Sequence, residues 1–309
     1  MNNNQNELVV KSNRLIEASY RLSLAEQRVV LLAIVEARRT QTGLSEADEL
    51  EIRAVDYAEM FDVPKNKAYE QTREASQTLF QRYVILYGTD PKTGKEDKLT
   101  VRWVSSVRYV DGSGTLYLQF AQKIVPYITR LEKEFTRYKL EKVANMSSPY
   151  AIRLYELLIQ WGSVGYREIE LEQLRKILMV VDEYKAIKDF KKRVIDVALS
   201  QINEFSDLTA SYTQRKTGRV VTHLIFRFSQ KEEPKPESEK TAVKQKTTAQ
   251  TEVLDEARAK TKALVIEFLS ENDTYKKRYP TIPVDQAWHV ENIRNEFMAE
   301  FTEWRKIRS

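Results

Sequence analysis

The pattern of apolar and polar positions predicts two similar successions of helices and strands along the chain. Stretches with apolar residues at helical spacing alternate with short stretches of the period-two pattern typical of half-buried strands. The first succession comprises a helix at 23–38, a strand at 50–53, helices at 56–61 and 65–82, a strand at 84–87, a polar loop at 88–98, and a strand at 99–110 that closes it. Segment 115–120 also has the period-two pattern of a strand. Ser23 and Glu26 have the spacing of a capping box, and Asp56 and Glu59 repeat it more weakly.

The second succession begins at the pair Ser148-Pro149, which supplies an N-cap residue and a proline for the first helical position. It comprises a helix at 148–160, a strand near 167–169, helices at 171–178 and 185–204, a strand at 208–214, a loop at 215–219 and a strand at 220–229. One apolar stripe follows the longest helix: Ile187, Phe190, Val194, Val197, Ala198, Ile202 and Phe205. Such a stripe indicates a helix that packs one face on a core.

The two successions are offset by 120 to 125 positions, measured between helix starts and between the loop glycines Gly94 and Gly218. A helix, a strand, two helices and a strand hairpin, in that order, are typical of the winged-helix variant of the helix-turn-helix. Its third helix usually lies in the DNA major groove, and its hairpin, the wing, touches the backbone. The sequence therefore predicts an α+β fold with two tandem winged-helix domains, a linker and a short helical C-terminal tail.

Composition shifts suggest where the domains end. We expect a first winged-helix domain at 7–130, a second at 131–230, a flexible linker at 231–250 and a helical C-terminal region at 251–309. The linker segment is rich in lysine, glutamate and threonine and nearly devoid of apolar residues, a composition that cannot build a core. Apolar faces predict tail helices at 253–269 and 284–307, and packing of these helices on each other is favoured over docking on a partner.

Composition agrees with a soluble protein of more than one domain. The chain has 309 residues, and 42% of them are hydrophobic. It contains no run of 18 apolar residues, so no membrane span is expected. The first six residues are polar and uncharged, unlike a secretory signal. The absence of cysteine excludes disulfides and thiolate metal sites and suits the cytoplasm, where we expect the protein to be located.

Basic residues gather where a winged helix would need them. The net charge is +5, and segment 185–193 carries five basic residues against one acid, while segment 212–219 carries three and no acid. A lysine-rich helix alone can be merely solvated, but two basic elements in winged-helix order favour DNA binding. We predict that Lys188, Lys191, Lys192 and Arg193 lie at or near the major groove, that Arg215, Lys216 and Arg219 contact phosphates, and that Lys185 opens the helix beside them.

The corresponding helix of the first succession is nearly neutral. Lys65, Lys67 and Arg73 are therefore predicted to make only auxiliary DNA contacts. The strand segment 101–109 is long and rich in β-forming residues, and such a strand at a sheet edge can pair with a second subunit. Packing of this strand inside its own domain is an equal alternative. We hypothesise that the first domain supports a monomer–dimer equilibrium.

Residue sets for enzymatic chemistry are missing. Segment 88–95 superficially resembles a phosphate-binding loop, but it is one residue too long, is followed by Glu96, and joins two strands. His223 and His289 are too far apart in sequence for a paired-histidine metal site, and no aspartate cluster suggests two metal ions. The tyrosines have no neighbouring base to activate them. We therefore expect no enzyme activity, no cofactor and no bound metal, and we assign His223 a structural role in its strand.

Several of these segments, in the same order and register, are similar to the iteron-binding plasmid replication initiators. The similarity to the second winged helix of that family lies at 184–195, 201–204, 207–208 and 216–219. The segments at 8–13 and 24–28 resemble the start of its first domain, so the resemblance covers roughly 7–230.

The resemblance implies a plasmid initiator that binds direct repeats (iterons) at the origin, distorts the DNA, and recruits host replication initiator and helicase proteins. It also implies that the second domain gives the main sequence readout, that the first adds contacts and the dimer interface, and that dimers repress the protein's own gene. The alternative is a winged-helix transcriptional regulator without a replication role, because both need the same groove contacts. Two DNA-reading units in one chain favour a long asymmetric site, and hence direct repeats over a palindrome.

Overall fold

The computed structural model describes residues 7–45, 48–90, 92–129 and 135–231 and, in the C-terminal part, residues 264, 266–278, 297, 300, 301 and 304. The chain divides into two compact units, Met1–Lys231 and Glu232–Ser309. The expected linker at 231–250, apart from Lys231, and most of the expected tail helices lie outside the described residues. None of the helices in the described part is long and apolar enough to span a bilayer.

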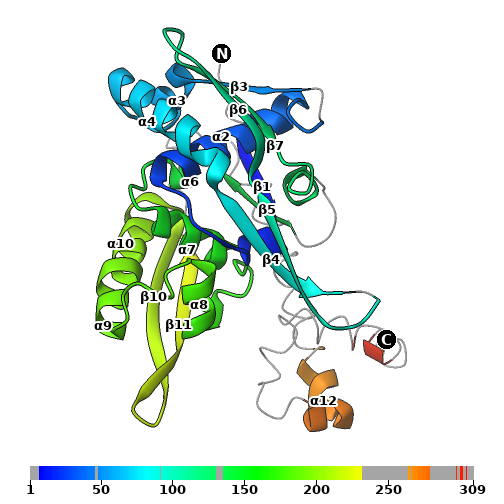
Figure 1. Cartoon of the computed structure of the whole chain (residues 1–309). Helices are drawn as coiled ribbons and strands as arrows, with labels where there is room; N and C mark the ends of the chain where they lie inside the picture. Colours follow the sequence, from blue (N-terminus) through cyan, green and yellow to red (C-terminus); the bar gives the residue numbers. More distant parts are fainter. Residues whose placement is uncertain are drawn as a thin grey trace, which may run out of the picture. The chain divides into compact units, whose positions relative to one another are not determined.

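The first winged helix has the predicted succession of a helix, a strand and two helices, but its hairpin is formed by other strands than predicted. It comprises α2 (Leu24–Thr40), β3 (Leu50–Arg53), α3 (Ala54–Met60), α4 (Lys65–Thr78), the short 3-10 helix η1 (Leu79–Gln81), β6 (Val104–Val110) and β7 (Thr115–Phe120) (Figure 1). The three strands form an antiparallel sheet of order β3-β7-β6. The capping box is confirmed: the Ser23 amide donates to the Glu26 carboxylate at 2.6 Å, and the Glu26 amide donates to the Ser23 hydroxyl at 3.2 Å. The weaker box is wrong, because α3 begins before Asp56, which instead accepts from Arg53 at 2.8 Å.

The strand predicted at 99–110 is two strands in two different sheets, β5 (Glu96–Arg102) and β6. Trp103 separates them and is fully buried, with its ring edge-on to Tyr20 at 4.9 Å between centroids. Its amide donates to the Arg82 carbonyl and its carbonyl accepts from the Ala121 amide, both at 3.1 Å. These contacts turn the chain from one sheet into the next.

The wing of the first domain is therefore the β6–β7 hairpin, and the predicted glycine offset between the wings is wrong. Its turn contains Gly112 and Gly114, both with positive φ. A Cβ added at Gly114 would stand 2.1 Å from the Tyr69 ring of α4, so this glycine allows the wing to approach that helix.

Gly94 belongs instead to the hairpin of β4 (Tyr83–Thr89) and β5, which joins β2 (Ser19–Tyr20) in a separate sheet of order β2-β4-β5. This hairpin extends away from the first winged helix (Figure 1). The Asp90 carboxylate accepts from the amides of Lys92 and Thr93 at 2.9 and 2.7 Å. The segment that resembled a phosphate loop is thus confirmed as a hairpin turn.

A third, two-stranded sheet closes the first domain. β1 (Leu8–Ser12) pairs antiparallel with β8 (Phe135–Lys139), with Leu8 opposite Lys139. β8 follows residue 130, where we expect the first domain to end, although it pairs with a strand of that domain. The boundary at 130 stays a prediction. The remaining short helices of this region are α1 (Asn13–Ile16), α5 (Pro126–Thr129) and α6 (Glu141–Ala144).

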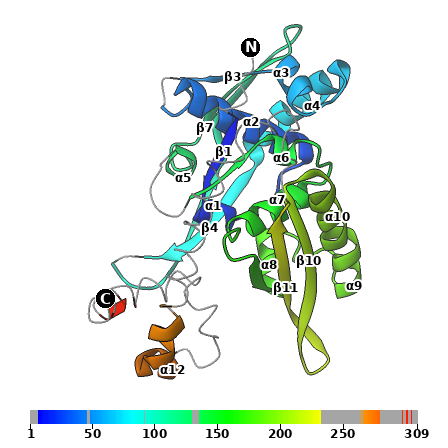
Figure 2. The ribbon, with the colours of Figure 1, turned by 180° about the vertical axis from the view of Figure 1, so that it is seen from behind.

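The second winged helix also has the predicted order. It comprises α7 (Pro149–Ile159), β9 (Tyr166–Glu170), α8 (Leu171–Ile177), α9 (Ile187–Phe190), the π-helical turn η2 (Lys191–Ile195), α10 (Asp196–Phe205), β10 (Leu208–Thr217) and β11 (Val220–Gln230). Its sheet has the order β10-β11-β9. Figure 2 shows α9 and α10 beside the β10–β11 hairpin, as Figure 1 does from the other side. The apolar stripe is buried at Phe190, Val194, Ala198 and Ile202, but Val197 is 38% exposed and does not belong to the core.

In the second unit, the structure describes α12 (Asp273–Arg278) and parts of the two predicted tail helices. Phe268 packs against Phe301 and Trp304, with ring centroids 5.5 and 5.7 Å apart. Tyr275 meets Phe297 at 6.0 Å. These contacts support the prediction that the two tail segments pack on each other.

Candidate nucleic-acid interface

The helix α9–η2–α10 and the β10–β11 wing border a groove of about 540 Å³, which we call the basic groove. Its lining residues are Ile187, Lys188, Lys191, Lys192, Asp196, Gln214, Lys216, Arg219 and Val221. Among the described residues that line it, five are basic and one is acidic. The structure thus brings together five of the eight residues predicted to bind DNA in this domain.

The turn before α9 is held by a buried arginine. Arg175 of α8 donates to the carbonyls of Glu183 and Tyr184 at 3.2 and 3.0 Å, and its guanidinium lies 4.7 Å from the Phe190 ring centroid. Tyr184 adopts the left-handed region with φ of 50°. α9 begins only at Ile187, so the prediction that Lys185 opens the helix is wrong; Lys185 is exposed in the turn.

Within the basic groove, the helix lysines differ in their surroundings. Lys188 and Lys192 are exposed and lie one helical turn apart. Lys191 is half-buried: its ammonium donates to Gln214 of β10 at 3.2 Å and lies 5.6 Å from the Tyr212 ring centroid. Lys191 therefore ties the helix to the wing, whereas Lys188 and Lys192 remain open to a ligand.

The acidic residue of the groove, Asp196, is hydrogen-bonded to a tyrosine of the wing. Asp196 accepts from the Tyr212 hydroxyl at 2.9 Å. Burial, reinforced by this hydrogen bond and by the Asp196 charge, raises the pKa of Tyr212 above its ordinary value of 10.0. Tyr212 stays protonated and keeps donating to Asp196, which leaves the basic side chains to dominate the groove.

On the wing, Lys216 and Arg219 flank the turn at Gly218 and are exposed. Arg215 faces elsewhere: its guanidinium lies 3.0 Å from the Glu168 carboxylate of β9 and 2.8 Å from the His223 Nε2 atom. A register irregularity between Arg215 and Lys216 accompanies this change of direction. The phosphate contact predicted for Arg215 is therefore not supported by its geometry, while His223 lies in a strand as expected.

Arg193 is exposed but does not line the basic groove. Arg193 follows Lys192 in the π-helical turn η2 and lies on the neighbouring flank of the helix. The predicted contact of Arg193 with a base edge would require DNA to reach that flank of the helix as well.

The equivalent groove of the first domain has the opposite charge. α4 and the β6–β7 wing border a hollow of about 600 Å³, lined by Tyr69, Glu70, Arg73, Glu74, Gln77, Tyr109, Asp111 and Gly112. Arg73 is the basic member among the described lining residues, and it lies 3.5 Å from Asp111. Lys65 and Lys67 are exposed on α4 outside this hollow, and Lys67 pairs with Glu70 at 3.0 Å. This hollow is therefore less suited to phosphates than the basic groove is.

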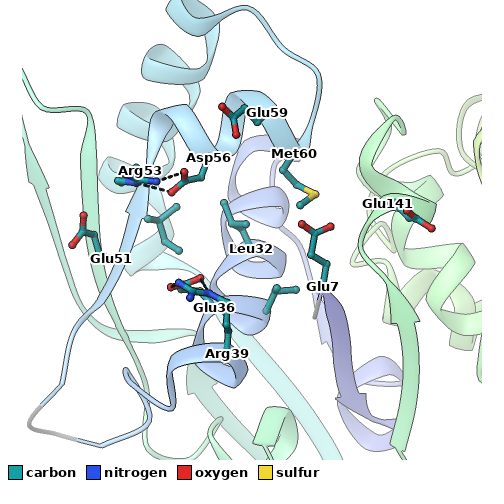
Figure 3. A pocket seen from close by; sticks show the side chains of 12 residues that line it. Glu7, Leu32, Glu36, Arg39, Glu51, Arg53, Asp56, Glu59, Met60 and Glu141 are labelled. Atoms are coloured by element: carbon teal, nitrogen blue, oxygen red, sulfur yellow. Dashed lines mark hydrogen bonds and ion pairs between the residues drawn. The ribbon is translucent and has the colours of Figure 1, made fainter. Parts of the chain in front are cut away.

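A further hollow of the first domain, of about 520 Å³, is also acidic (Figure 3). Its carboxylates come from Glu7, Glu36, Glu51, Asp56, Glu59 and Glu141. The two arginines that line it are already paired, Arg39 with Glu36 at 3.0 Å and Arg53 with Asp56 at 2.8 Å (Figure 3). Of the three hollows described above, the basic groove is thus the one suited to a polyanion.

Comparison with known proteins decides the family. The profile of "Initiator Replication protein, WH1" matches residues 8–159, and that of "Initiator Rep protein, WH2" matches residues 170–228. An Escherichia coli relative described as "Uncharacterized 27.6 kDa protein" is 30% identical over 226 residues, covering 70% of this chain and 93% of the relative. The chain belongs to the replication initiator protein family. The resemblance inferred from the sequence segments is confirmed.

Two further Escherichia coli relatives carry the names that this family implies. A "Replication initiation protein" is 26% identical over 227 residues, covering 71% of this chain and 69% of the relative. A "PI protein" is 25% identical over 258 residues, covering 74% and 84%. The crystal structure of the Pi initiator protein in complex with iteron DNA shares the fold of this replication initiator, with a TM-score of 0.61, 24% identity, and coverage of 74% of this chain and all of that one.

Proposed function

We propose that this replication initiator binds direct repeats (iterons) at a plasmid origin through the basic groove, distorts the duplex, and recruits host replication initiator and helicase proteins. The observation that carries this proposal is the contrast between the basic groove and its acidic equivalent in the first domain. The Pi initiator, which has the same fold, was crystallised with iteron DNA.

In this proposal α9–η2–α10 enters the major groove, with Lys188 and Lys192 at or near the base edges and within reach of the phosphates that border the groove. Lys216 and Arg219 of the wing contact the flanking phosphates. The first domain adds contacts from Lys65, Lys67 and Arg73 farther along the same duplex. Bending a site of 20–30 base pairs costs on the order of 1–6 kcal/mol, which two domains holding one duplex can offset.

A test of replication separates an initiator from a plain regulator. The DNA beside the gene is cloned on a plasmid without any other origin, and the protein is supplied from a second, compatible plasmid. We expect the first plasmid to be maintained only when the intact chain is supplied. A chain that binds this DNA and represses its promoter, yet does not support maintenance, would be the transcriptional regulator instead.

We further propose that the first domain dimerises. The strand predicted at 101–109 contributes to β5 and β6, which are both edge strands of their sheets. Beside the β5 edge, Tyr83 and Tyr87 of β4 are 43% and 51% exposed. We expect sedimentation velocity to show a monomer–dimer equilibrium for the full chain.

The double variant Tyr83→Ser/Tyr87→Ser should shift that equilibrium to monomer, because it removes apolar surface beside the pairing edge. The matched control is Trp161→Ser, which removes a 40% exposed aromatic from the second winged helix and should dimerise as the parent does. A full-length protein that stays monomeric at the highest concentration tested would contradict the proposal.

We expect the purified protein neither to hydrolyse ATP, nor to nick DNA, nor to extend a primer. In the part of the chain that the structure describes, no group of three or more histidine, aspartate or glutamate side chains is arranged to hold a metal ion. Assays with Mg²⁺, nucleotides and supercoiled origin DNA check this. Nicking or synthesis that a point change in this chain abolishes would overturn the prediction.

A further inference from the structure

A cluster of ionisable side chains lies buried where the two winged helices meet, and we call it the polar junction. Its members are Lys11 of β1, Tyr20 of β2, Tyr138 of β8, and Arg153 and Glu156 of α7, and Glu156 is 0% exposed. Glu156 Oε1 accepts from Lys11 Nζ and from the Tyr138 hydroxyl, both at 2.6 Å. Glu156 Oε2 accepts from the Tyr20 hydroxyl at 3.3 Å and from Arg153 at 3.2 Å.

The segment 16–21 of the first domain extends this junction along the second winged helix. Arg153 donates to the carbonyls of Ile16 and Ala18 at 3.1 and 2.9 Å. Glu17 accepts from Arg167 of β9. Arg21 pairs with Glu183, in the turn that precedes the recognition helix. Contacts of the first domain therefore reach up to the start of the DNA-reading helix.

Contacts of this kind impose one geometry. A buried ion that leaves its partner keeps its desolvation cost and loses the compensating interaction. Because Glu156 is shared by donors from β1, β2, β8 and α7, a rotation between the domains would break several of these bonds together. The junction thus holds the two winged helices at one mutual orientation.

We propose that the polar junction sets the spacing of DNA contacts that the protein accepts, and that Glu156 is its positioning residue. This inference rests on the proposed function, in which both winged helices hold one duplex. Inserting one base pair between the two contacted segments moves the distal one by about 3.4 Å and rotates it by about 35°. A protein whose winged helices are held at one orientation must then lose the DNA contacts of one domain. If the junction is loosened, the two domains can reorient and keep the DNA contacts of both.

The test compares three full-length proteins: the parent, Glu156→Gln and Glu204→Gln. Glutamine keeps the size of the side chain but removes the charge that Lys11 and Arg153 share. Glu204 is exposed on α10 and serves as the matched control. Each is titrated with the repeat from the DNA beside the gene, with the same repeat carrying a one-base-pair insertion, and with a half-length duplex that spans only the footprint of the second winged helix.

We expect the insertion to lower the DNA affinity of the parent and of Glu204→Gln about tenfold or more. The affinity of Glu156→Gln should fall less than about threefold. All three proteins should bind the half-length duplex alike, since the basic groove is unchanged. An equal insertion penalty in Glu156→Gln and the parent would overturn the junction's role. Failure of the parent to prefer the repeat over unrelated DNA would instead refute the proposed function.

Tyr138→Phe provides a second variant if Glu156→Gln does not fold, as judged by circular dichroism. It removes one hydrogen bond to Glu156 and retains the charges. An insertion penalty smaller than that of the parent supports the inference, and a penalty equal to that of the parent counts against it.

Discussion

Replacing Lys188, Lys192 and Arg219 together by alanine will remove most of the affinity for the origin repeats and make the remaining binding much less salt-dependent. These exposed side chains line the basic groove from both the helix and the wing. Each phosphate contact contributes about 0.9 to the slope of log K against log [salt], so the slope should flatten by up to about three units. Fluorescence anisotropy at several salt concentrations measures both quantities.

The matched control removes the same number of charges from the first domain. Lys65, Lys67 and Arg73 are replaced by alanine; Lys67 and Arg73 are already paired with Glu70 and Asp111. We expect a slope change of about one unit or less. Equal losses in the two triple variants would mean that the second winged helix is not the main reader.

Glu156→Ala will destabilise the folded chain by about 3–5 kcal/mol, because it leaves the buried Lys11 and Arg153 without their counter-charge. Urea unfolding of the full chain measures the loss. Glu204→Ala, at an exposed position, should stay within about 0.5 kcal/mol of the parent. A Glu156→Ala protein as stable as this control would show that the junction is not a stabilising feature.

The same carboxylate should make stability sensitive to acid. Burial alone would raise the pKa of Glu156, but the charges of Lys11 and Arg153 and the hydrogen bonds from Lys11 and Tyr138 outweigh burial and hold the pKa below its ordinary value of 4.5. The folded state therefore binds this proton more weakly than the unfolded state does. Its contribution is present above pH 4.5 and is lost as the pH falls through the folded-state pKa. The urea midpoint of the parent should consequently fall more steeply below pH 4.5 than that of Glu156→Gln.

Sequence patterns that span only a few residues predict many of the helices and strands. The capping box of Ser23 and Glu26 marks the start of α2, and the buried stripe from Phe190 to Ile202 marks the recognition helix; both follow from residues a few positions apart. Lys188 and Lys192 could be found in the same way, because helical spacing alone places them off the buried stripe.

Short-range patterns do not predict structure that depends on contacts between residues far apart in the sequence. β-propensity is continuous through 99–110, and the break at Trp103 exists because that ring is buried against Tyr20. The misplaced first wing in turn concealed Asp111, which adds a third acid to the groove of the first domain beside Glu70 and Glu74. Arg215 looked like any wing arginine, and only the pairing of β9 with β11 brings Glu168 to it.

The polar junction has a local signal in the sequence of α7. Arg153 and Glu156 stand one turn apart in a helix that is otherwise strongly apolar, with both positions buried. Charged residues are rarely buried unless they are paired, so this pair indicates a partner from elsewhere in the chain. Its identity as Lys11, distant in sequence, required the structure.

A hydroxyl-radical footprint of the full chain on the DNA beside its gene tests the central claim most directly. We expect tandem protections in one orientation, each about two helical turns or roughly 20 base pairs long. They should disappear with the Lys188/Lys192/Arg219 triple variant and persist with the Lys65/Lys67/Arg73 one. A single palindromic protection, or protections that the first triple variant leaves intact, would contradict it.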